Sequence, residues 1–357
     1  MKLRIYFRPS IAVLWLGAFA VLFWCAALVF GSGVRWLALP FAVFYTLLFA
    51  ISGWALWRIH VIEHWTRWDA SGRLLILAPH EDDCVISAGG IAARNQRLGG
   101  VTRIVYLAPD EAAGLAELRA AEARAAWREA GLAPGDLRHL DLLPPLRRRD
   151  PVKLQAAART LRAIIDDFQP TTIVMPMFEG GHIHHDMVAA LVGSIVTSQD
   201  KFAVFEAPEY SPNVSLNDTP HRIIALSVRW LFGLVSYQGP PDGIDGRPLL
   251  KFRLDPTELD CKRRMLAAFA SQNAPSLVMT RCYPDRLVRW DQKSQRRHPF
   301  DFQHSWLRLV LAARLRMPAK IVDRIFPLQR GTIGREGRIT DWLEESTLEG
   351  NPRGNAG

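Results

Sequence analysis

Two apolar runs near the N-terminus constrain this chain more than any other feature. Ile11–Gly31 and Trp36–Trp57 contain no Asp, Glu, Lys or Arg. A helix of either length can cross the roughly 30 Å hydrocarbon core of a bilayer, whereas a cleavable signal peptide has a shorter apolar region and no second span. A helical hairpin buried in a soluble core is the alternative. With Gly31-Ser32-Gly33 as a tight connection, we expect residues 1–72 to form a transmembrane hairpin of two helices.

The positions of Lys and Arg around these runs predict the orientation of the hairpin. Three basic residues precede the first run and three follow the second, whereas Arg35 stands alone between the runs. The six flanking residues are Lys2, Arg4, Arg8, Arg58, Arg67 and Arg73. Because positively charged flanks remain on the cytoplasmic side, we expect both termini and the following domain to be cytoplasmic, at a bacterial inner membrane. The four cysteines agree with a reducing compartment, and they show no metal-type spacing.

After the hairpin, strand-like runs alternate with helical patterns. The predicted strands are Leu74–Leu77, Arg103–Leu107, Thr172–Met177 and Phe202–Phe205, and the predicted helices are Ala112–Ala130, Pro151–Phe168, Asp186–Ser198 and Pro256–Ala270. This alternation is typical of an α/β fold with a Rossmann-like, mostly parallel sheet flanked by helices. No Gly-x-Gly-x-x-Gly follows a strand, so dinucleotide binding is not indicated. We expect residues 73–345 to form one large domain and residues 346–357 to be a flexible tail.

Two polar segments follow two of the predicted strands. The first is His80-Glu81-Asp82-Asp83, with Gly89-Gly90 behind it, and the second is His182-Ile183-His184-His185. Parallel α/β sheets place their chemistry at the carboxyl ends of strands. Two His and one carboxylate form a known zinc set that leaves a coordination position for water. Taken singly, the Asp pair could be a helix cap or turn and the His cluster a polar surface, but together they indicate a hydrolytic metal site.

The spacing within these segments suggests different roles for their members. His80 and Asp83 are three positions apart, close enough on a tight loop to hold one ion, and His185 would be the third ligand. Asp82 would then lie beside the metal without being needed as a ligand, so its carboxylate could take a proton from water. A protonated His182 could stabilise the oxyanion of a tetrahedral intermediate.

The two segments resemble the motifs of the PIG-L/LmbE family of zinc-dependent N-deacetylases, which act mainly on N-acetylglucosamine-type amides. That family carries His-Pro-Asp-Asp after its first strand and a later His-Pro-Asp-His. Here Glu81 and Ile183 replace the two prolines, and His184 replaces the second Asp. Further matches are Arg119-x-x-Glu122 and Lys262 leading to Ser271-Gln272, so that the likeness covers roughly residues 74–272.

The resemblance implies the same site as the spacing does. It implies Zn²⁺, or another divalent metal such as Fe²⁺, bound by His80, Asp83 and His185, with Asp82 as base and His182 as oxyanion stabiliser or acid. It also implies that Arg119 binds the substrate, for which the alternative is an i,i+3 salt bridge to Glu122. His184 stands where the family has an Asp that orients the first His of its motif. As a neighbour of the ligands, His184 could accept a hydrogen bond, serve as an extra ligand or mark a weakened enzyme.

Two further stretches bear on possible partners. Ser211–Lys251 surrounds the apolar Ile223–Val235 and could be a substrate-facing insertion, a helix on the bilayer or an ordinary buried element. Arg281–Arg338 holds 14 Lys and Arg against 5 Asp and Glu, a surplus of nine that equals the net charge of the chain, +9. Since a basic residue near anionic lipid contributes about 1 kcal/mol, we expect a basic extension in contact with membrane lipids. A solvated surface is the alternative, and nucleic acid is not expected.

These features together predict a membrane-anchored, metal-dependent N-deacetylase. The expected substrate is an N-acetylamino sugar in a lipid-linked glycan or an envelope polysaccharide precursor, because a soluble substrate would not require an anchor. Two alternatives remain open. One is a non-catalytic glycan- or lipid-binding relic of the same fold, and the other is a metal-dependent hydrolase of another amide.

Overall fold

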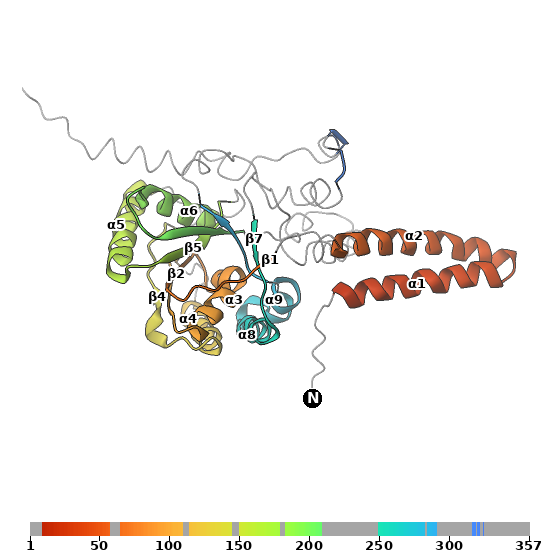
Figure 1. Ribbon diagram of the computed structural model, residues 1–357, viewed down its shortest axis with the longest axis horizontal. Coiled ribbons are helices and arrows are strands. Elements are labelled where there is room, and N and C mark those ends of the chain that lie inside the picture. The colour runs from red at the N-terminus through yellow and green to blue at the C-terminus, as the bar shows by residue number, and fades with distance from the viewer. Residues whose placement is uncertain are drawn as a thin grey trace, which may run out of the picture. The chain divides into compact units, whose positions relative to one another are not determined.

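The computed structural model describes residues 9–57, 65–109, 114–144, 150–178, 183–208, 249–282, 284–290, 316–318, 320–321 and 324. The chain divides into two compact units, of which one contains Met1–His64 and the other Trp65–Tyr210 (Figure 1). Several sequence-based expectations lie wholly or mostly outside the described residues. They concern His182, the stretch Ser211–Lys251, most of the basic stretch Arg281–Arg338 and the tail 346–357.

The N-terminal apolar runs form two antiparallel helices, α1 (Pro9–Val29) and α2 (Ser32–Trp57) (Figure 1). Aromatic rings interlock along their contact: Phe23 stacks on Tyr45 with ring centroids 5.5 Å apart. The connection is shorter than predicted, because Ser32 and Gly33 already belong to α2. By length and composition, both helices could cross a membrane.

The second unit is built on one eight-stranded sheet with the order β1-β7-β8-β6-β5-β2-β3-β4. The strands are β1 (Trp65–Thr66), β2 (Arg73–Ala78), β3 (Val101–Tyr106), β4 (Leu137–His139), β5 (Thr172–Pro176), β6 (Ala203–Ala207), β7 (Leu249–Phe252) and β8 (Arg286–Arg289). The pairs β2–β3, β2–β5, β3–β4, β5–β6 and β1–β7 are parallel, and β8 runs antiparallel to β6 and β7. The four predicted strands correspond to β2, β3, β5 and β6.

Helices cover both faces of this sheet. They are α3 (Asp83–Arg97), α4 (Ala116–Glu129), α5 (Pro151–Phe168), α6 (Ile183–Ile195), α8 (Pro256–Ala267) and α9 (Ala274–Arg281), with short 3₁₀ turns η2 (Pro134–Asp136) and η4 (Ala270–Gln272). Side chains of a strand alternate between the two faces of a sheet. Leu74 and Ile76 of β2 accordingly share one core with α3, α4 and α8, while Leu75 and Leu77 share the other with α5 and α6. The prediction of an α/β fold with a sheet flanked by helices is confirmed.

Local chemistry explains where α5 begins and ends. Asp150 accepts a hydrogen bond from the backbone nitrogen of Lys153, and Pro151 occupies the first turn, where no hydrogen-bond donor is required. Gln169 ends the helix with a left-handed φ of 50°. These signals are local, so the predicted and observed bounds of this helix are the same.

A buried ion pair between Lys262 of α8 and Asp285, the residue before β8, packs against the middle of α3. The side chains of Lys262 and Asp285 are fully buried and 2.5 Å apart, and Lys262 Nζ also donates to the carbonyl of Ile86 at 2.7 Å. Asp285 accepts hydrogen bonds from the backbone nitrogens of Gly90 and Ile91. A Cβ at Gly90 would lie 3.0 Å from Asp285 Oδ2 and 2.4 Å from a Leu254 methyl group. The second glycine of the Gly89-Gly90 pair therefore makes room for this ion pair and for Leu254.

Candidate metal centre

The two polar segments meet because their strands are neighbours. β2 ends at Ala78, and the turn after it leads into α3, which begins at Asp83. β5, the parallel neighbour of β2, ends at Pro176, and α6 begins at Ile183. Parallel strands present their carboxyl ends at one edge of a sheet. The start of α3 and the start of α6 are therefore brought to the same place.

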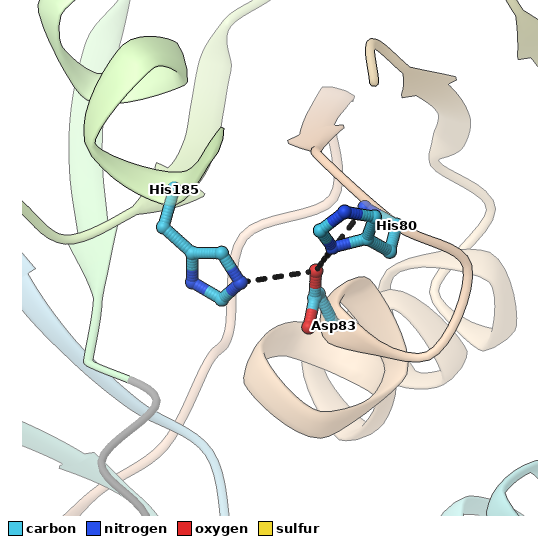
Figure 2. Close-up of side chains that lie close together, drawn as sticks. All are labelled: His80, Asp83 and His185. Atoms are coloured by element: carbon cyan, nitrogen blue, oxygen red, sulfur yellow. Dashed lines mark hydrogen bonds and ion pairs between the residues drawn. The ribbon is translucent and has the colours of Figure 1, made fainter. Parts of the chain in front are cut away.

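Two histidine rings converge on one carboxylate oxygen, which brings three potential ligands together. Asp83 Oδ2 lies 3.0 Å from His80 Nδ1 and 3.3 Å from His185 Nε2, and both rings face it in Figure 2. One ligand atom from each residue lies within 4.8 Å of the other two. Tetrahedral zinc with bonds of about 2.0–2.2 Å places its ligand atoms about 3.3 Å apart. The cluster therefore has donor types and spacings that fit a zinc-like divalent ion.

The protonation state of Asp83 suits a metal ligand. Burial by itself raises the pKa of its carboxyl, but the charges and hydrogen bonds of His185 and His80 outweigh this effect, so that the pKa lies well below its usual range. Asp83 is consequently an anion at neutral pH. The backbone nitrogen of His80 also donates to Asp83 Oδ2, at 3.1 Å, and helps to fix that oxygen between the two rings.

Asp82 lies next to this cluster at the N-cap of α3. Burial and then the charge of Asp83 raise its pKa to about 7, while His80 and Arg281 act in the opposite direction. With its amide nitrogen turned toward Asp82, Gln272 donates to Oδ1 at 2.8 Å and to Oδ2 at 3.1 Å. The side chain of Asp82 is thus fixed by a hydrogen-bond donor from η4. Its pKa is close to neutral pH, as is typical of a general base.

The turn that carries Gln272 is fastened to α4. Buried Glu122 accepts hydrogen bonds from the backbone nitrogen of Ser271 at 2.7 Å and from its hydroxyl at 2.6 Å. The sequence had indicated Ser271 and Gln272 only as weak family matches, and their contact with Asp82 and Glu122 was missed. Arg119, the predicted substrate-binding residue, lies on α4 one turn before Glu122 and is half-buried.

His184 is buried between the metal cluster and the loop after β4. Its Nδ1 lies 3.2 Å from His80 Nε2, and its Nε2 lies 3.1 Å from the carbonyl oxygen of Pro144. The sequence placed His184 near the ligands but gave no indication of Pro144. The predicted oxyanion stabiliser, His182, precedes the first described residue of α6.

Comparisons with known proteins agree with the motifs. Residues 75–196 match the family model described as PIG-L, GlcNAc-PI de-N-acetylase. Two curated relatives, from Mycobacterium sp. strains KMS and JLS, are each named 1D-myo-inositol 2-acetamido-2-deoxy-alpha-D-glucopyranoside deacetylase. Both are 28% identical over an alignment of 171 residues, which covers 39% of this chain and 53% of the relative. The chain therefore spans about half the length of the curated relatives that it matches.

Among solved structures, similar chains include a deacetylase triple mutant of the teicoplanin biosynthetic pathway and a conserved protein from Thermus thermophilus. The first is 18% identical, with a TM-score of 0.44 over 61% of this chain and 97% of that chain. The second is 22% identical, with a TM-score of 0.41 over 60% of this chain and 93% of that chain. The family match includes His80, Asp82, Asp83 and His185. Over residues 75–196, this chain is therefore similar to the PIG-L family of de-N-acetylases.

Proposed function

We propose that this chain is a membrane-anchored, metal-dependent N-deacetylase that hydrolyses the acetamide of an N-acetylamino sugar on a lipid-linked glycan or an envelope polysaccharide precursor. The observation that carries the proposal is the convergence of His80, Asp83 and His185 on one point, with the carboxylate of Asp82 beside them. The similar family is a GlcNAc-PI de-N-acetylase, and the curated relatives are deacetylases of a 2-acetamido-2-deoxy-glucopyranoside, so both descriptions name removal of acetyl from a glucosamine unit.

The proposed chemistry assigns a separate task to each residue. His80, Asp83 and His185 would hold a divalent ion, which supplies Lewis acidity and lowers the pKa of a water molecule to about 7. Asp82, oriented by Gln272, accepts the proton that the attacking water gives up as it adds to the amide carbonyl. His182 is proposed as the group that stabilises the oxyanion or protonates the leaving amine, and Arg119 as a contact for the sugar.

Support for a membrane anchor comes from the surface of the hairpin. Large apolar side chains cover α1 and α2, with Leu28 and Trp36 each 72% exposed. Burying a Leu or Phe side chain contributes about 1.5–3 kcal/mol, so a hairpin with this surface is stabilised by a hydrocarbon environment. A lipid-linked substrate follows from this anchor, since an enzyme at the bilayer surface meets such a substrate by diffusion in two dimensions.

Removal of the metal is expected to abolish acetate release from an N-acetylglucosaminyl glycolipid, and addition of Zn²⁺ or Fe²⁺ to restore it. Reconstituted full-length protein would be treated with a chelator and assayed for free amine. The His80→Ala/His185→Ala double variant should lack stoichiometric metal by elemental analysis, because two of three ligands are gone. Full activity of the metal-free protein, or retained metal in the double variant, would contradict the proposal.

Reporter fusions test the proposed topology. A fusion after Arg73 should report a cytoplasmic position and a fusion at Ser32 an external one, because six of the seven flanking Lys and Arg residues lie outside the connection. The same reporter on a chain without residues 1–72 serves as a cytoplasmic control. The opposite pattern would assign the catalytic domain to the outer side.

If the chain without residues 1–72 stays on membranes and salt releases it, the stretch Arg281–Arg338 is a second, electrostatic anchor.

A further inference from the structure

Polar atoms of four residues form a chain of contacts from the loop after β4 to the metal cluster. The carbonyl oxygen of Pro144 lies 3.1 Å from His184 Nε2, and His184 Nδ1 lies 3.2 Å from His80 Nε2. On the other side of the His80 ring, Nδ1 lies 3.0 Å from Asp83 Oδ2. Only 1% of His184 is exposed, so its ring nitrogens are satisfied within the protein rather than by bulk water.

The chemistry of these atoms determines which nitrogen carries each hydrogen. A carbonyl oxygen only accepts hydrogen bonds, so His184 Nε2 must be the donor to Pro144. In a neutral imidazole the other nitrogen then has a lone pair, and His184 Nδ1 accepts a hydrogen bond from His80 Nε2. His80 is thereby left with the lone pair of Nδ1, which faces the carboxylate of Asp83. Two electron pairs that face each other at 3.0 Å require a cation between them, which is either a proton, as in a hydrogen bond from a charged His80, or a metal ion.

We propose that His184 is a positioning residue that fixes His80 in the tautomer presenting Nδ1 to the metal, with the Pro144 carbonyl as the fixed end of the chain. The inference rests on the proposed metal site and adds a role that the family motif does not provide. An ionised Asp at position 184 could accept from His80 Nε2, but it has no hydrogen to donate to Pro144. His184, in place of the family Asp, therefore connects the ligand His80 to the backbone carbonyl of Pro144.

Two amide side chains separate the two ends of His184. Asn carries its oxygen as many bonds from Cα as His184 Nδ1, so His184→Asn keeps an acceptor for His80 Nε2. Gln carries its nitrogen as far out as His184 Nε2, so His184→Gln keeps a donor for Pro144 but removes the acceptor beside His80. His184→Phe removes both groups and retains the ring.

The test is the affinity of the full chain for Zn²⁺, measured by competition with a chelator, together with thermal unfolding of each variant. Loss of a residue that orients a metal-binding His costs about 10–100-fold in metal affinity. We expect His184→Gln and His184→Phe to show that loss, and His184→Asn to stay close to the parent. All folded variants should still bind one Zn²⁺ at saturation, because the three ligands are intact.

The outcomes distinguish this inference from the proposed function. If the parent binds Zn²⁺ and deacetylates, but His184→Gln binds as tightly as the parent, the positioning role is wrong and the metal site stands. Equal weakening in His184→Asn and His184→Gln would also overturn it, since contact with His80 would then be irrelevant. If the parent binds no divalent metal at all, the proposed function fails first. Should His184→Phe not fold, the comparison of the two amide variants still decides.

Discussion

Replacing Asp82 with Asn is expected to lower the rate of deacetylation about 10²–10⁴-fold, the usual effect of losing a general base. The amide retains the size of the side chain and one oxygen that can accept from Gln272, but it cannot take a proton from water. Metal content should remain near that of the parent, because Asp82 is not one of the three converging residues. Release of free amine from the substrate and elemental analysis of the same preparations measure the two quantities.

Glu81 offers a matched control for this experiment. It is a buried carboxylate one position away, and its Oε1 lies 3.8 Å from His139 Nε2. Glu81→Gln makes the same chemical change as Asp82→Asn and is expected to leave activity near the parent value. If both variants lose activity equally, the charge of the loop matters and the base is not identified. An Asp82→Asn enzyme as fast as the parent would refute the proposed mechanism.

The ligand set could be predicted because the information lies in two short segments after apolar strands. His80 and Asp83 share one tight turn, and β2 and β5 are buried strands that their continuous apolar runs reveal. Gln272 and Pro144 could not be assigned in this way. Each reaches the site from a different segment, and only the packing of η4 against α4 and of the loop after β4 against α6 brings them there.

Elements that depend on tertiary contacts escaped prediction for a related reason. β7 and β8 are four residues each and contain Lys251, Arg286 and Arg289, so no apolar run marks them. α3 was not predicted, and it contains Gly89-Gly90, a pair that disfavours a helix interior. In the structure, Leu254 and Asp285 approach Gly90 so closely that a larger residue would not fit there. The sequence around the glycines does not reveal this packing reason for two residues that disfavour a helix.

Replacing Lys262 with Met is expected to destabilise the domain by about 3–5 kcal/mol, the cost of removing one partner of a buried ion pair. Asp285 would keep its buried charge, and the carbonyl of Ile86 would lose its bond to Lys262. Arg264 on the same helix is the control, because its side chain is 49% exposed in its pairs with Glu129 and Asp260. Arg264→Met should change stability by less than about 1 kcal/mol. Thermal unfolding of the full chain in detergent compares the two variants.

The pH dependence of the Lys262→Met variant tests the cause of its instability. Burial already raises the pKa of Asp285 against the opposing charge of Lys262, and without Lys262 the pKa must rise further. A carboxyl whose pKa is higher in the folded than in the unfolded chain binds more protons when folded, so stability increases as the pH falls through the folded-state value. The deficit relative to the parent should therefore shrink on acidification and be largest at high pH. A deficit that does not change with pH would mean that lost packing, rather than the buried charge, destabilises the variant.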